Sequence, residues 1–158
     1  MKIRRPCRVF IDGASRGNPG PAGIGVVVRD VDKDSSRYFC RYLGKTTNNV
    51  AEYSALIEAL KIAGDQGFTN LLIRTDSELL TRQVAGQYRV HAPHIQELLD
   101  RARALLVDFD EVRVEHVPRE ENRQADWLAN QAVDRRAGTL TELQAPPSRI
   151  GGQPKKAL

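Results

Sequence analysis

The sequence has few of the features that mark membrane-spanning or disulfide-stabilised proteins. Its 158 residues include two cysteines, Cys7 and Cys40, which match neither a zinc-ligand spacing nor a disulfide framework. No apolar run approaches the roughly 18 residues of a transmembrane helix, and Asp12 interrupts the apolar residues that could begin a signal peptide. These absences predict a cytoplasmic protein with buried thiols and no membrane segment.

Length and composition are those of one ordinary globular domain. The chain is 41% hydrophobic and 28% charged, and a chain of this size buries roughly 70% of its unfolded surface without disulfide bonds. From Gly138 onward the apolar periodicity stops. We therefore expect a folded domain over residues 1–137 and a flexible basic tail over residues 138–158. We also expect the protein to be a monomer.

Basic charge is concentrated at the two ends of the chain. The net charge is +4, and residues 1–8 carry +4 and residues 146–158 carry +3 without any acidic residue. The body between them therefore carries a charge of −3. Because this body is acidic, the basic net charge alone does not predict a basic face that binds nucleic acid.

The apolar pattern predicts three strands in an antiparallel meander, followed by helices that alternate with strands. The first helix is expected to be capped by Asn48 or Asn49 and to end near Gly64. The expected strands are residues 7–13, 24–29, 37–43, 71–76 and 112–114, and the expected helices are about 49–63, 77–85, 93–106 and 125–133. This order favours an α/β fold with one mixed sheet.

The glycine-rich residues 13–23 are expected to form a loop that does not bind a nucleotide. Residues 20–25 read GPAGIG, have no Gly-Lys-Ser/Thr ending, and lead into a strand rather than a helix. The sequence also has no G-x-S-x-G motif and shows no Ser/His/Asp nucleophile set. A tight turn explains the glycines better than a phosphate-binding loop does.

Two aspartates close expected strands. Asp12 ends the first strand and Asp76 ends the fourth, and functional groups gather at the carboxyl ends of parallel strands. Two neighbouring carboxylates repel each other unless a cation lies between them, and their hard oxygen ligands favour Mg²⁺ or Mn²⁺. The alternative is that each aspartate only begins a turn.

Four ordered blocks of the sequence resemble the type 1 ribonuclease H family. They lie at residues 10–20, 46–52, 73–77 and 121–129 and read FIDGASRGNPG, TTNNVAE, IRTDS and ENRQADWLA. The resemblance covers residues 8 to about 136. It implies a mixed five-stranded sheet in the order 3-2-1-4-5, flanked by helices, in which the first, fourth and fifth strands are parallel.

The resemblance also implies an activity and a set of catalytic carboxylates. The family hydrolyses the RNA strand of RNA/DNA hybrids and leaves 3′-hydroxyl and 5′-phosphate ends. Its four carboxylates match Asp12, Glu52, Asp76 and Asp126, which would hold two Mg²⁺ or Mn²⁺ ions. On this interpretation Asp12 bridges both ions, Glu52 and Asp76 hold one, and Asp126 holds the other. Taken alone, Glu52 could be only a capping-box acid and Asp126 only a first-turn acid.

Further positions match family residues that contact the substrate. Asn18, Asn48 and Asn49 correspond to residues near the minor groove of the hybrid, and Thr47 to one that binds a phosphate of the DNA strand. His116 matches the loop histidine that assists proton transfer or product release, although a lone histidine is often only structural.

The sequence departs from the family after the third block, where many members carry a lysine-rich protrusion. Residues 77–106 contain four arginines and three acidic residues, and Glu78 replaces a common glutamine. We therefore expect weaker binding of the hybrid, or help from the basic termini, from residues 87–90 or from a partner. Two other functions are considered: a hybrid-binding module without catalysis, and a 3′–5′ exonuclease, which typically begins with Asp-x-Glu instead of the Asp12-Gly-Ala found here.

Overall fold

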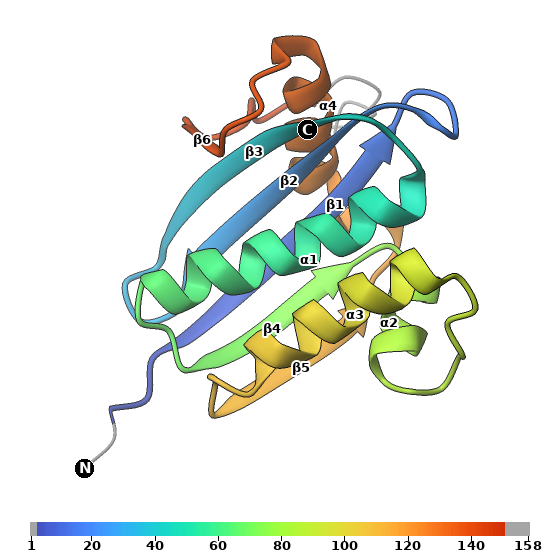
Figure 1. Ribbon diagram of the computed structural model, residues 1–158. Coiled ribbons are helices and arrows are strands. Elements are labelled where there is room, and N and C mark those ends of the chain that lie inside the picture. Colours follow the sequence, from blue (N-terminus) through green and yellow to red (C-terminus); the bar gives the residue numbers. More distant parts are fainter. Residues whose placement is uncertain (1–2, 151–158) are drawn as a thin grey trace.

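A computed structural model describes residues 3–150 of the protein (Figure 1). Residues 151–158 of the expected basic tail lie outside the described part. Along the chain the elements are β1 (Pro6–Ser15), β2 (Gly20–Asp30), β3 (Ser35–Thr46), α1 (Asn48–Asp65), β4 (Asn70–Thr75), α2 (Glu78–Val84), α3 (Pro93–Leu106), β5 (Glu111–His116), the 3₁₀ turn η1 (Arg119–Glu121), α4 (Arg123–Arg135) and β6 (Thr141–Leu143). In this part of the chain, every helix is too short or too polar to cross a bilayer.

The strands form one mixed sheet in the order β5-β4-β1-β2-β3-β6. β1, β4 and β5 are mutually parallel, whereas β2, β3 and β6 extend the sheet by antiparallel pairing. The predicted α/β class and the 3-2-1-4-5 order of the first five strands are confirmed. The sheet has one strand more than predicted, because β6 pairs with the outer edge of β3.

Strand β6 lies in the segment that was expected to be a flexible tail. Its three residues pair with Tyr38, Phe39 and Cys40 of β3. The Arg37 guanidinium adds two hydrogen bonds to the Glu142 carboxylate, at 2.8 and 2.6 Å. Three residues are too few to show a period-two pattern, so the strand depends on its partner and was not visible in the sequence.

The first two strands are longer than predicted, and the connection between them is correspondingly short. β1 continues to Ser15 and β2 begins at Gly20, so only residues 16–19 join them. Glycine interrupts the apolar pattern of β2 because α4 packs there very closely. A Cβ atom on Gly23 would overlap the backbone carbonyl of Ala129. This contact explains why the first residues of β2 were predicted to belong to a loop.

Helices cover both faces of the sheet (Figure 1). α1 packs on β1 and β2 and is flanked by α3, whereas α4 packs on β1, β2 and β3 from the opposite side. The larger core lies under α1 and α3 and includes Ile11, Tyr53 and Leu56, all fully buried. A smaller cluster under α4 contains Leu128 and Ala132, with Trp127 and Leu143 at its margin.

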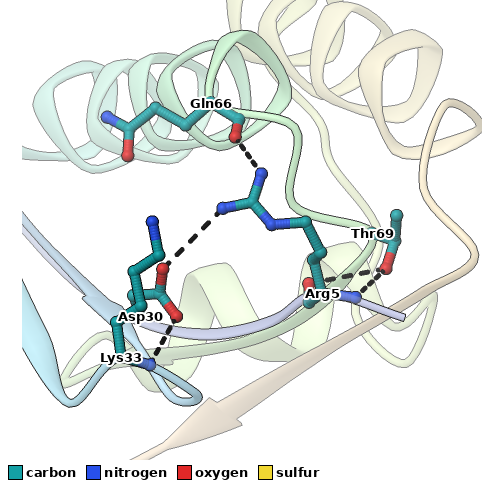
Figure 2. A network of polar contacts seen from close by, with 5 residues as sticks. All are labelled: Arg5, Asp30, Lys33, Gln66 and Thr69. Carbon is teal, nitrogen blue, oxygen red and sulfur yellow. Dashed lines mark hydrogen bonds and ion pairs between the residues drawn. The ribbon is translucent and has the colours of Figure 1, made fainter. Parts of the chain in front are cut away.

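One of the basic residues near the N-terminus is bound into the fold (Figure 2). The backbone N–H of Arg5 donates to Thr69 Oγ1 at 2.8 Å, and its guanidinium donates to the Gln66 carbonyl at 2.6 Å. The same guanidinium lies 3.7 Å from the Asp30 carboxylate and stacks on the Phe68 ring. Arg5 therefore joins the start of β1 to the end of α1 and to the loop before β4.

Candidate active site

Four carboxylates from different elements face one cleft. Asp12 lies within β1, and Asp76 immediately follows β4, whose last residue, Thr75, is paired with Ile11. Glu52 lies on α1 and Asp126 in the first turn of α4. All four line a polar cleft of about 380 Å³. The chain thus brings together residues that are up to 114 positions apart in the sequence.

Three of these carboxylates lie very close together. One oxygen from each of Asp12, Glu52 and Asp76 can be chosen so that all three atoms lie within 4.8 Å of one another. Asp12 and Glu52 are only 4% and 5% exposed. Like charges at this separation in a buried site are unfavourable, so the group is suited to bind a cation.

A glycine permits the close approach of α1 to β1. A Cβ atom on Gly13 would overlap the backbone of Ala51 and Glu52, and the Gly13 N–H donates to Glu52 Oε1 at 3.2 Å. Glu52 therefore binds β1 and not the start of its own helix. The capping-box interpretation of Glu52 is wrong, and so is the predicted cap at Asn48 or Asn49, because Thr47 is the N-cap and accepts from Val50 N–H at 3.3 Å.

Asn122 connects the start of α4 to β1, a role that was not predicted from the sequence. Its side-chain amide donates to the Ile11 carbonyl at 2.8 Å, one residue before Asp12, and it is 1% exposed. Its own backbone carbonyl accepts from Asp126 N–H at 3.1 Å. The same residue thus fixes the backbone beside Asp12 and the helical turn that carries Asp126.

Burial and mutual repulsion raise the pKa values of the three clustered carboxyls. Desolvation raises the pKa of Asp12 well above its usual range, and the negative charges of its three neighbours raise it further. Desolvation, followed by the charge of Asp76, raises the pKa of Glu52 to about 8. Desolvation also raises the pKa of Asp76, although the positive charge of Arg119 is among the influences that lower it.

The residues fit a divalent cation. Glu52 Oε2 is buried and has no hydrogen-bond partner in the described part of the chain. A buried, unpaired carboxylate oxygen beside two further carboxylates is the donor set that Mg²⁺ and Mn²⁺ prefer. Asp126 faces the same cleft but lies outside the group of three.

The predicted substrate-binding residues lie around the start of α1, where Asn48 lines the cleft. Asn18 Oδ1 accepts from the Asn48 N–H at 3.0 Å, which joins the β1–β2 connection to the start of α1. Asn48 is exposed and lines the cleft, and Asn49 follows it in the first helical turn. Thr47 Oγ1 serves as the helix cap. Of the four predicted residues, Asn48 therefore lines the cleft, and Asn18, Thr47 and Asn49 are joined to it by a hydrogen bond or by the chain.

His116 is not among the residues that line the cleft in the described structure. It is the last residue of β5, is exposed, and pairs in register with Thr75 of β4. Arg119, three residues later, does line the cleft. Arg119 could not be predicted from the sequence, since an arginine in a charged, polar turn has no distinctive pattern.

Comparison with known proteins identifies the family. The family model described as reverse transcriptase-like matches residues 10–132. Ribonuclease HI of Halobacterium salinarum is 45% identical over 125 residues, which are 79% of this chain and 63% of that protein. The solved RNase H1 structure from that organism superposes with a TM-score of 0.79 at 43% identity and covers 82% of this chain and 98% of that one.

The chain belongs to the type 1 ribonuclease H family. The chain also superposes on LC11-RNase H1, solved in complex with an RNA/DNA hybrid, with a TM-score of 0.78 at 39% identity, covering 82% of this chain and 98% of that one. A bifunctional protein of Mycobacterium tuberculosis is 41% identical over 140 residues, which are 88% of this chain and 38% of that protein. The chain spans 63% of the length of the Halobacterium salinarum protein and 38% of the length of the Mycobacterium tuberculosis protein.

Proposed function

We propose that the protein is an endoribonuclease that hydrolyses the RNA strand of RNA/DNA hybrids with the help of divalent cations. The observation that carries this proposal is the buried group of Asp12, Glu52 and Asp76 within 4.8 Å, open to a polar cleft. Membership of the ribonuclease H family and the hybrid bound to LC11-RNase H1 support the choice of substrate.

The four carboxylates would hold two Mg²⁺ or Mn²⁺ ions. Asp12 lies in the group of three carboxylates and lines the cleft with Asp126, so it would supply a ligand to both ions. Glu52 and Asp76 would hold one ion with it, and Asp126, which lies apart from the group of three, would hold the other. When bound, the two cations supply the Lewis acidity that activates a water and stabilises the leaving oxygen.

The reaction is a hydrolysis in which the water oxygen bonds to phosphorus as the bond to the 3′-oxygen breaks. One water proton passes to the 3′-oxygen, and the water oxygen stays on the phosphate, so the products carry 3′-hydroxyl and 5′-phosphate ends. Two hydrogen bonds hold the carboxylates in place. The Gly13 N–H donates to the Glu52 carboxylate, and the Asn122 side-chain amide donates to the Ile11 carbonyl beside Asp12. This preorganisation spares the site a rearrangement during the reaction.

Asn18, Thr47, Asn48 and Asn49 would distinguish the two strands of the substrate. The Asn48 side chain is exposed in the cleft, and its backbone is held by Asn18. An amide both donates and accepts, as recognition of a 2′-hydroxyl requires. Thr47 would approach a phosphate of the DNA strand while it caps α1.

A cleavage assay with four substrates tests the proposal. We expect Mg²⁺ or Mn²⁺ to activate internal cleavage of the RNA strand of a hybrid, with EDTA abolishing it and with double-stranded RNA, double-stranded DNA and single-stranded RNA cut more slowly. The variant Asp76→Asn should retain below about 1% of wild-type turnover, because it removes a charged ligand at nearly constant volume.

The variant Asp100→Asn is the matched control for Asp76→Asn. Asp100 is exposed on α3 and bonds only to Gln96 among the described residues, so its loss should leave turnover unchanged. Circular dichroism should show both variants to be folded. Unchanged turnover in Asp76→Asn, or retained hybrid binding without any cleavage by the wild type, would exclude the endonuclease in favour of another function.

A further inference from the structure

Arg119 is the only lysine or arginine among the described residues that line the carboxylate cleft. It is the first residue of η1, between β5 and α4. Its side chain is exposed, and in residues 3–150 it makes no hydrogen bond or ion pair, whereas Arg16 and Arg37, which are also exposed, are each paired with an acid. A free guanidinium therefore faces four carboxylates.

Hydrogen bonds hold the backbone on both sides of Arg119 in the chain. Val117 is buried, and its N–H donates to the Thr75 carbonyl at 2.8 Å, one residue before Asp76. The Asn122 N–H donates to the Arg119 carbonyl at 3.0 Å, and the Asn122 amide holds β1 beside Asp12. The turn that carries Arg119 is thus bonded to the residue before Asp12 in β1 and to the residue before Asp76 at the end of β4.

The guanidinium is close enough to influence the carboxylates of the cleft electrostatically, and it forms no ion pair with them. Its positive charge helps to lower the pKa of Asp76, against the stronger effect of burial. No ion pair within 4.0 Å joins Arg119 to any described carboxylate, so its donors remain available to a ligand. A planar guanidinium presents several donors that match the oxygens of a phosphate, and charged hydrogen bonds of this kind are strong.

We propose that Arg119 is a catalytic residue that donates to a non-bridging oxygen of the scissile phosphate. This inference rests on the proposed function, in which the phosphate enters the carboxylate cleft. Negative charge grows on the non-bridging oxygens as the water oxygen bonds to phosphorus, and the positive charge of Arg119 stabilises it. Arg119 would therefore stabilise the negative charge of the transition state at this site.

Steady-state kinetics on an RNA/DNA hybrid with Mg²⁺ test the assignment. We expect Arg119→Ala to lower kcat about 10- to 100-fold and to change KM less than about threefold, because the contact strengthens in the transition state. Arg119→Lys should recover part of kcat, since it keeps the charge but loses the planar donors. Added guanidinium ions should restore turnover of Arg119→Ala in a saturable manner, which a purely structural role of Arg119 would not allow.

Two variants serve as controls. Arg113→Ala removes the same charge from an exposed position on β5 outside the cleft lining, and it should cleave at the wild-type rate. His116→Ala tests the alternative that the histidine supplies this contact, and it should lower kcat less than Arg119→Ala does. Thermal unfolding should confirm that each variant is folded.

The possible outcomes separate this inference from the proposed function. If the wild type cleaves the hybrid and Arg119→Ala does so at the same rate, the assignment of Arg119 is overturned and the proposed function stands. The assignment also fails if Arg113→Ala loses as much activity, if His116→Ala loses more, or if guanidinium gives no rescue. A wild-type protein that cleaves no hybrid contradicts both.

Discussion

At the scale of single residues, the clustered carboxylates oppose folding when no cation is bound. Asp12 and Glu52 are almost fully buried, and burial is the main cause that raises their pKa values. Burial of an unpaired carboxylate lowers the free energy of unfolding by several kcal/mol, so an isolated acid is unfavourable at such a position. The chain instead adds bonds that hold the carboxylates in place, such as the Gly13 N–H on Glu52.

This arrangement predicts how stability depends on pH. The pKa of Glu52 rises from 4.5 to about 8 in the folded protein, so the folded state binds a proton that the unfolded state has already released. The stabilisation is therefore complete below about pH 4.5 and is lost as the pH rises towards 8. In EDTA, we expect the free energy of unfolding to fall across this range, with a contribution from Glu52 of up to a few kcal/mol.

The variant Glu52→Gln isolates this contribution. The amide oxygen can still accept from the Gly13 N–H, but it never ionises, so the variant should be more stable than the wild type at pH 8 in EDTA by about 2 to 3 kcal/mol. Urea unfolding at pH 5 and pH 8 measures the difference, and Mg²⁺ should stabilise only the wild type appreciably. Glu97→Gln, at an exposed position on α3, is the control. Equal stability of Glu52→Gln and the wild type at pH 8 would contradict the prediction.

At the scale of secondary structure, apolar periodicity predicted the first five strands and the helices but not their ends. β1 and β2 exceed the predicted bounds because their glycines serve close contacts with α1 and α4, which no local pattern reveals. Thr47 caps α1 in place of the predicted asparagines, since several polar residues in succession could each accept the bond. β6 was missed because it is short and depends on β3.

The same limit explains what could be predicted of the site. The four ordered blocks located Asp12, Glu52, Asp76 and Asp126, which the structure brings to one cleft. Asn122 lay within the last block but was missed, because its role is a bond to a carbonyl 111 residues away. Arg119 lies outside the blocks and was missed because only the folded chain places η1 beside the ends of β1 and β4. Long-range contacts of this kind follow from topology and not from local composition.

Strand β6 and its edge contacts offer a test at this scale. Leu143 packs at the margin of the cluster under α4 that also includes Trp127, adjacent to Asp126. We expect Leu143→Ala to lower the free energy of unfolding by about 1 to 2 kcal/mol, since the side chain is only half-buried. Glu142→Ala should cost less than about 1 kcal/mol, because its ion pair with Arg37 is exposed.

Fluorescence of the single tryptophan, Trp127, can follow the unfolding by urea. Leu140→Ala is the matched control, because Leu140 is 38% exposed and precedes β6. If Leu143→Ala and Leu140→Ala were equally stable, β6 would not contribute to the packing under α4. A larger loss in Glu142→Ala than in Leu143→Ala would mean that the ion pair, and not the apolar contact, holds the strand.

At the scale of the whole molecule, charge is divided between an acidic body and basic ends. The body carries −3, and four of its acids face the cleft, so binding of two divalent ions would bring it to about +1. One basic residue of the N-terminal segment is not available to a substrate, because Arg5 binds Gln66, Thr69 and Asp30 within the fold (Figure 2). The α2 helix adds little, since Arg82 is paired with Glu78.

The basic C-terminal residues therefore become candidates to contact the phosphate backbone of a hybrid. Residues 151–158 include Lys155 and Lys156, and removing them leaves β6 and the buried Pro146 intact. We expect a chain that ends at residue 150 to bind a hybrid more weakly than the full chain at low salt and equally at high salt. Binding releases about one counterion from the nucleic acid for each phosphate contact. Loss of two lysines should therefore make the slope of log affinity against log salt shallower by up to about two.

Binding of a labelled hybrid to Asp76→Asn chains in Mg²⁺, across a range of salt concentrations, measures these slopes without cleavage. A full-length chain with Lys155→Gln and Lys156→Gln should behave like the truncated chain, because the effect depends on charge and not on length. Equal slopes for all three chains would show that the C-terminal lysines make no phosphate contact. The salt dependence would then have to come from the folded body, where Arg119 lines the cleft and the four carboxylates would hold cations.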